Sequence, residues 1–376
     1  MSQAQAMPML KETLDLYDIA LLLNYERLAT NRRFRGAKLL DVARDGGPFT
    51  DERIKPHWDR TGYFEKTAAA QITPGQPSFE FVSKLDEPRH GVSLLFHLNH
   101  ANRDPEADDE SSANILATAV QRDVASGATS PPFRFSDLQL SDRERETLFH
   151  QSRDVGASES AVRLLQHFFS LYPADTLLRI RSYDRSEPEY ITTISHRLVL
   201  PYVLRGLRMH TISSFLSHDS PVCTSPGQDG RARHTVLTFG NAPARWDNIR
   251  TVVHLTSLEF GDAGRGVKGK GTFVLEPIQA YDARLERVAE ANELLMEEIM
   301  PELPPPSEGG EEEEAHLKAL AARVKRRWDK RVAEPWCGHC GAPEPKVQAK
   351  CCSSARYCNR EHQVSAWPFH KMFCGH

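Results

Sequence analysis

Almost all of this 376-residue chain is devoid of cysteine. Seven cysteines are present, and only Cys223 lies before Cys337. A single thiol cannot form a disulfide within that region, so a disulfide-stapled fold is excluded for it. Reduced thiols are typical of intracellular proteins, and we expect this protein to lie in the cytoplasm or the nucleus.

Long apolar runs and a strong imbalance of charge are also missing. No segment reaches the roughly 18 apolar residues of a membrane-spanning helix. The N-terminal residues lack the basic start and the apolar stretch of a signal peptide. The formal net charge is −4 and the isoelectric point is near 6.5. We therefore expect no membrane partner, and the charge balance does not favour nucleic acid.

Residues 1–300 carry a mixture of helical and strand patterns. Helical spacing is found over 12–30 and over 161–172, where Leu164, Leu165, Phe168 and Phe169 share one face. Strand-like segments are found at 92–98, 198–204, 235–239, 252–260 and 272–278. A long helix is expected from Tyr281 to Ile299, and residues 45–90 are expected to be irregular. These blocks predict an α+β body, and a division near 1–155 and 156–300 is left open.

The pattern changes over residues 301–314. This segment begins Pro-Glu-Leu-Pro-Pro-Pro and ends in four glutamates, a composition that predicts a stiff and then charged linker. A helix is expected over 315–335, with Leu317, Leu320, Val324 and Trp328 on one stripe and basic residues at 325–331 opposite. The neighbouring glutamates favour charge balance on a solvated helix over a nucleic-acid site.

Residues 337–374 hold cysteine and histidine at the spacing of metal ligands. About forty residues are too few to bury a self-supporting apolar core, so a metal is expected to hold them. The candidate ligands are Cys337, Cys340, Cys351, Cys352, Cys358, His362, His370 and Cys374. Thiolates and imidazoles are zinc ligands, and eight suffice for two closed sites. Closed sites are structural rather than catalytic.

The segment resembles a MYND-type zinc finger. Besides the cysteines and histidines, the match includes Tyr357, Gln363, Trp367, Pro368 and Lys371. The resemblance covers residues 337–374 alone, and the overall layout resembles fungal MYND-finger proteins with an uncharacterised N-terminal region. It implies two zinc ions in an interleaved arrangement. The first would be bound by Cys337, Cys340, Cys358 and His362, and the second by Cys351 and Cys352 together with His370 and Cys374.

One departure from the family pattern concerns the second zinc. The family has Cys-x2-Cys where this chain has adjacent Cys351 and Cys352, and Ala349 stands at the other expected cysteine position. Adjacent side chains point in different directions in most backbone conformations. Three outcomes are open: both cysteines bind the ion, the second site is weak, or His376 or water completes it.

A protein-interaction function is what the resemblance implies. Better-studied relatives bind proline-rich peptides of the type Pro-x-Leu-x-Pro, and Pro301–Pro305 of this chain has that pattern. A proline-rich segment is preformed and loses little entropy on docking. One hypothesis is therefore that this segment masks its own finger or that of a neighbouring copy. We also expect that a chelator unfolds the finger and leaves the body largely intact.

Two other classes of function are weighed against this one. An enzyme targeted by the finger, for example a SET-like methyltransferase, would use the Asn99-His100 pair, but the cysteine and proline that usually follow are missing. The segment from Gly264 to Gly271 nearly spells a phosphate-binding loop, yet a strand-like run follows it instead of a helix, which favours a hairpin loop. A transcription-related, nucleic-acid-associated regulator would use the basic helix. We expect a non-enzymatic protein.

Overall fold

The computed structural model describes most of the chain outside three long N-terminal segments. The described residues are 13–34, 37–44, 91–98, 140–183, 189–216, 222–224, 231–241, 245–306, 309–352 and 354–374. All structural statements below concern these residues. The expected irregular segment 45–90, the Asn99-His100 pair and His376 lie outside them, as does the side chain of Cys223.

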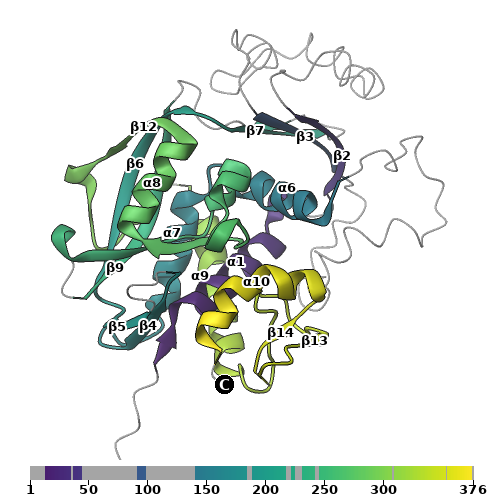
Figure 1. Ribbon diagram of the computed structural model, residues 1–376. Coiled ribbons are helices and arrows are strands. Elements are labelled where there is room, and N and C mark those ends of the chain that lie inside the picture. Colours follow the sequence, from purple (N-terminus) through teal and green to yellow (C-terminus); the bar gives the residue numbers. More distant parts are fainter. Residues whose placement is uncertain are drawn as a thin grey trace, which may run out of the picture.

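Helix α1 (Leu16–Ala29) lies at the centre of the described structure and is buried on nearly every side (Figure 1). It begins after Asp15, whose carboxylate accepts a hydrogen bond from the backbone N–H of Asp18 at 3.2 Å. Its dense leucines are buried on several sides, and its buried polar residues Asn24, Glu26 and Arg27 have polar partners, which is typical of a helix enclosed by other elements. Helices α7 (Ser158–Phe169) and α9 (Glu311–Asp329) and strand β4 (Leu177–Arg181) pack against it. Both expected helices, at 12–30 and 161–172, are confirmed.

The largest sheet is antiparallel, with strand order β11-β10-β9-β6-β12. Its strands are β6 (Arg197–Leu207), β9 (Arg231–Gly240), β10 (Ile249–His254), β11 (Val274–Pro277) and β12 (Ala289–Leu294). Side chains alternate between its faces. Val199, Leu237 and Val253 join the main core around α1. The opposite face buries its apolar side chains under helix α8 (Ile278–Val288) in a second core.

Two smaller sheets flank this arrangement. One joins β1 (Leu14–Asp15), β4 and β5 (Glu189–Thr193). The other joins β2 (Ala37–Arg44), β3 (Gly91–Leu98), β7 (His210–Leu216) and β8 (Val222–Thr224), next to helix α6 (Asp142–Asp154). The strand expected at 92–98 is β3. Helices and several sheets in one chain confirm the α+β class.

Two sequence-based predictions in this region were wrong. The strand expected at 252–260 ends at His254, and a 3-10 helix, η7 (Ser257–Gly264), follows. The helix expected from Tyr281 to Ile299 ends at Val288, and residues 289–294 form β12. The physical reason is tertiary: β12 pairs antiparallel with β6, from Ala289 opposite Leu207 to Leu294 opposite Tyr202. Backbone pairing with an otherwise open sheet edge outweighs helical propensity there.

Helix α9 begins and ends earlier than the sequence indicated. It spans Glu311–Asp329 rather than 315–335, so the four glutamates form its first turn, where acidic side chains stabilise the helix dipole. Its predicted stripe of Leu317, Leu320, Val324 and Trp328 is buried in the main core. No helix among the described residues is long and apolar enough to cross a membrane.

Candidate metal centre and its seat on the body

Short elements bring the candidate ligands together. A tight turn holds Cys337 and Cys340, with the backbone N–H of Gly341 donating to the Cys337 carbonyl at 2.9 Å. Strands β13 (Val347–Gln348) and β14 (Arg356–Tyr357) form a small antiparallel pair before Cys358. Helix α10 (Arg360–Phe373) starts after Asn359, whose side chain accepts the N–H of His362 at 2.8 Å. This cap sets the direction in which α10 presents His362 and His370.

The first cluster consists of Cys337, Cys340, Cys358 and His362, with one ligand atom from each within 4.8 Å of the others. The Cys337 sulfur lies 3.4 Å from His362 Nδ1, and the sulfurs of Cys340 and Cys358 are 3.7 Å apart. Two thiolates bound to one tetrahedral zinc stand about 3.8 Å apart, and a thiolate and an imidazole about 3.6 Å. The observed spacings fit a single ion at the centre.

The second cluster consists of Cys351, Cys352, His370 and Cys374. His370 Nε2 lies 3.1 Å from the Cys351 sulfur and 3.6 Å from the Cys352 sulfur, so the two adjacent cysteines converge on one imidazole. Ala349, at the position where the family has its other cysteine, is buried in the finger interior. The structure thus gathers all eight candidate residues in the two groups that the resemblance implied.

The electrostatics of both clusters suit a cation. Burial opposes ionisation of Cys337, but contacts with Cys340, Cys358 and His362 outweigh it and lower its pKa well below the usual value. Contacts with Cys337 and Cys358 raise the pKa of Cys340 well above its usual value. The close thiols thus hold negative charge in a small volume, and a divalent ion bound between them would neutralise this charge. In the second cluster, burial and then Arg181 lower the pKa of His370, so its imidazole is neutral and can act as a ligand.

Two groups of three cysteines and one histidine define a zinc finger with two closed sites. Compared with known families, residues 337–374 match the family described as the MYND finger. The finger binds zinc, two ions fit its clusters, and MYND fingers are protein-interaction modules. Comparisons of the chain with curated proteins and with solved structures give no match.

The finger lies directly against α1 (Figure 1). Gly341, just after the first turn, has a φ of +78°, and a Cβ there would lie 2.6 Å from the Leu21 carbonyl oxygen. Arg327 of α9 donates to the Gly341 carbonyl at 2.6 Å and to Glu26 at 2.8 Å. Only glycine permits both this backbone conformation and this approach.

Helix α10 also contributes to the main core. Phe369 is 5% exposed and stacks on Tyr17 of α1, with ring centroids 3.7 Å apart and planes 13° apart. In return, Tyr25 of α1 packs inside the finger beside Cys337 and Cys340. The finger and the body therefore share an interior. The sequence alone suggested that a chelator would leave the body largely intact. We now expect chelation to destabilise the body as well, because loss of the finger would uncover part of the main core.

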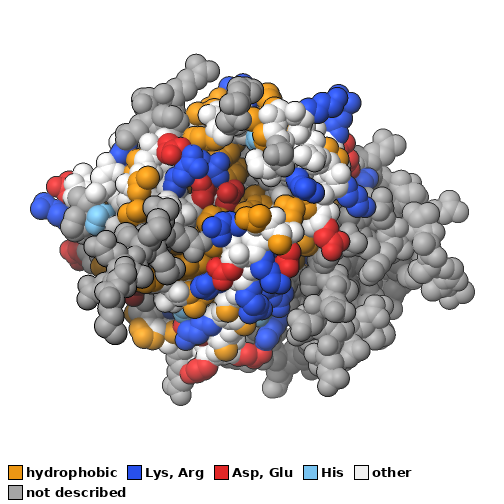
Figure 2. All heavy atoms as spheres, turned by 90° about the horizontal axis from the view of Figure 1, so that it is seen from below, with side chains coloured by type: hydrophobic (Ala, Val, Ile, Leu, Met, Phe, Trp, Pro, Cys, Tyr) orange, Lys and Arg blue, Asp and Glu red, His pale blue; other side chains and the backbone are white. Residues whose placement is uncertain are grey.

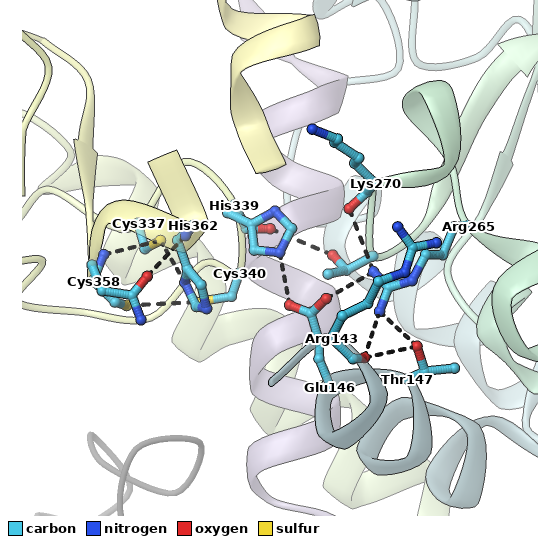
Figure 3. Close-up of polar contacts among 12 residues, drawn as sticks. Arg143, Glu146, Thr147, Arg265, Lys270, Cys337, His339, Cys340, Cys358 and His362 are labelled. Atoms are coloured by element: carbon cyan, nitrogen blue, oxygen red, sulfur yellow. Dashed lines mark hydrogen bonds and ion pairs between the residues drawn. The ribbon is translucent and has the colours of Figure 1, made fainter. Parts of the chain in front are cut away.

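A third contact involves His339, the residue between the first two cysteines (Figure 3). Its Nε2 lies 2.7 Å from Glu146 of α6, and Glu146 accepts from Arg265 at 2.7 Å. Burial alone would raise the pKa of Glu146, but His339 and Arg265 hold it well below its usual value. His339 belongs to neither of the two finger clusters. The structure shows a link to the body, and the sequence carried no signal for its partner Glu146.

The proline-rich segment contacts the body in the described structure. Arg163 of α7 donates to the Pro304 carbonyl at 2.7 Å, and the backbone N–H of Leu303 donates to Gln166 of α7 at 3.4 Å. Leu303 is partly buried against the main core. These contacts do not support the hypothesis that the segment masks its own finger.

The glycine-rich segment 264–271 has a packing role. A Cβ on Gly264 would lie 1.6 Å from the Ser257 carbonyl oxygen, so this glycine allows close backbone contact. The segment contains a 3-10 helix, η8 (Val267–Gly269), and leads into β11 rather than into a helix. It lacks the helix N-terminus that a phosphate-binding loop requires.

Proposed function

We propose that this protein is a non-enzymatic interaction protein whose finger binds a proline-rich segment of a partner through the outer face of α10. The observation that supports this most is a pair of exposed apolar side chains one helical turn apart. Val364 is 51% exposed and Trp367 45% exposed, while Ala366 and Phe369 of the same helix are buried. Proline-rich peptides bind to exposed aromatic surfaces because their conformation is preformed.

The basic residues of α9 support this proposal over a nucleic-acid function. Lys325 pairs with Asp329 at 2.7 Å, and Lys330, just after the helix, pairs with Glu334 at 2.8 Å. Arg327 is occupied by Glu26 and Gly341. Figure 2 shows basic and acidic side chains interspersed over the coloured part of one face. Pairing with a neighbouring carboxylate offsets part of the positive charge that would attract phosphates.

One pocket of the body offers few of the side chains that usually act in catalysis, which favours a non-enzymatic role. A polar hollow at the edge of the five-stranded sheet is lined, among the described residues, by Ser182, Tyr190, Ile249, Arg250, Thr251, Pro277 and Gln279. These residues include no histidine, cysteine, lysine or carboxylate. Its hydroxyls, on Ser182, Tyr190 and Thr251, have no general base among these residues to activate them.

The test measures the affinity of the zinc-loaded chain for a labelled peptide of the Pro-x-Leu-x-Pro type by fluorescence anisotropy. We expect Trp367→Ala to weaken binding at least about tenfold, since exposed tryptophans often dominate such interfaces. Val332→Ala, a change at a 95% exposed valine outside the finger, is the matched control and should leave the affinity unchanged. Zinc content is measured for each variant. Equal affinities of wild type and Trp367→Ala would contradict the proposal.

A further inference from the structure

Three metal-ligating side chains meet inside the body on the large sheet. His234 belongs to β9, His254 to β10 and Glu259 to the 3-10 helix η7. One possible ligand atom from each lies within 4.8 Å of the other two. The two imidazole rings are T-shaped, with centroids 4.3 Å apart. None of the three belongs to either finger cluster.

This cluster is enclosed. The two histidines are each 2% exposed, and the Glu259 side chain is 10% exposed. Among the ion pairs of the described residues, Glu259 has only one, with His234. The nearby guanidinium of Arg27 is paired with Asp154 at 2.5 Å, and that of Arg284 with Glu276 at 2.7 Å. The carboxylate therefore has no arginine or lysine partner among the described residues.

The contact between His234 and Glu259 is close but is not a good hydrogen bond. Glu259 Oε1 lies 2.8 Å from His234 Nδ1, yet Oε1 has no aligned donor among the described residues. His234 Nε2 is also buried without a hydrogen-bond partner there. Leaving a buried polar atom unsatisfied is unfavourable, and an ion held by His234 Nδ1 and Glu259 Oε1 would satisfy Oε1. Two ligands bound to one metal ion stand roughly 3 Å apart without pointing at each other, as this nitrogen and oxygen do.

We propose that His234, His254 and Glu259 bind a divalent ion of the zinc class, at a third site separate from the finger. Two imidazoles and one carboxylate are a ligand set for borderline transition metals. The Thr256 hydroxyl, 3.1 Å from His254 Nε2, lies close enough to contribute a further oxygen. Because the site is enclosed, the ion would be structural. It would tie β9 and β10 to η7, the segment just before Arg265.

One other cluster in the body–finger contact could compete for an additional ion. Glu146, His339 and His362 also lie within reach of one another. However, Glu146 and His339 already satisfy each other at 2.7 Å, and His362 belongs to the first finger cluster. In the sheet cluster, by contrast, Glu259 Oε1 is buried without a hydrogen-bond partner among the described residues, although both ring nitrogens of His254 lie near hydroxyls, Thr256 at 3.1 Å and Tyr281 at 3.4 Å. The two sites can be told apart by substitution.

The experiment is a count of zinc per full-length chain by mass spectrometry, after loading with zinc and removal of free metal. We expect about three ions in the wild type and about two in Glu259→Gln, which preserves the size of the side chain. His150→Gln removes another buried histidine of the body and should retain three, as should Glu146→Gln. Circular dichroism verifies that each variant is folded.

X-ray absorption at the zinc edge provides a readout that requires no variant. The six finger thiols, shared among three ions, give an average of about two sulfur ligands per zinc, against about three for two ions. Two ions with three sulfurs each would overturn the proposal and leave a metal-free His234–Glu259 pair. Loss of the third ion in Glu146→Gln, with retention in Glu259→Gln, would overturn it as well.

Discussion

The main core of the body consists of leucine, valine and aromatic side chains from α1, α7, α9 and the large sheet. The interior of the finger consists of cysteines, alanines and two tyrosines. The first is stabilised by apolar burial, the second by metal–ligand bonds. Yet Phe369 of the finger lies in the core of the body, and Tyr25 of the body lies in the interior of the finger. Two regions with different stabilising chemistry therefore depend on each other at their contact.

Removing zinc should have the largest effect on the stability of these two regions. Structural zinc contributes about 10–16 kcal/mol to isolated fingers. We expect chelation, or Cys337→Ser, to unfold the finger and to lower the melting temperature of the body by at least about 10 °C. Scanning calorimetry measures both transitions, and re-addition of zinc to chelated wild type is the control. A body transition that is identical with and without zinc would show that the two regions are independent.

Phe369→Ala separates packing from metal binding. Truncating a buried phenylalanine costs about 3–5 kcal/mol, and Phe369 is not a ligand, so zinc content should be unchanged. Denaturant unfolding measures the loss. Trp367→Ala, two positions earlier on α10 and 45% exposed, is the control and should cost clearly less stability than Phe369→Ala, because Phe369 is 5% exposed. Equal effects of the two substitutions would refute the shared core.

Gly341→Ala tests the close approach of the finger to α1. A non-glycine residue at positive φ costs about 1–3 kcal/mol, and overlap with the Leu21 carbonyl adds to this. Gly309 is a matched control, because its φ is +90° and nothing lies within 4 Å of its Cβ position. We expect Gly341→Ala to destabilise the protein by about 1–2 kcal/mol more than Gly309→Ala. The urea midpoints of both variants supply the measurement.

Acid should weaken the body through His150, which faces Glu146, His339, Arg265 and Arg27. Burial, against the opposing effect of Glu146, lowers the pKa of His150 to about 3. The unfolded state, with a pKa near 6.5, therefore binds the proton first. The contribution of the neutral His150 side chain to the free energy of unfolding is therefore complete above about pH 6.5. It declines by about 1.4 kcal/mol per pH unit as the pH falls toward 3. Unfolding of wild type and His150→Gln between pH 7 and 5 measures it, and parallel pH profiles would count against this assignment.

The metal ligands could be predicted because their chemistry is local in the sequence. Cysteine and histidine at short spacings predicted both clusters, and the stripes of α7 and α9 predicted their buried faces. The adjacent Cys351 and Cys352 could not be interpreted from spacing, since their convergence on His370 depends on the fold of the loop between β13 and β14.

The contact between finger and body was not predictable from the sequence. Glu146 and His339 are 193 positions apart, and nothing in either segment indicates the other. Likewise, residues 289–294 have a helix-forming composition, and their pairing with β6 depends on an edge that exists only in the folded sheet. Local patterns reveal which residues seek burial or metal, whereas contacts over long separations are set by the complete fold.

The contact between Glu26 and Arg327 spans 301 positions of the chain. At typical rates of synthesis, roughly 15–60 s separate the emergence of these two residues from the ribosome. Throughout that interval α1, a helix with nearly all of its side chains buried in the folded protein, has no finger to cover it. The contact between body and finger can therefore form only after the finger has been translated, and we expect the zinc available at that stage to affect how much of the nascent chain reaches the folded state.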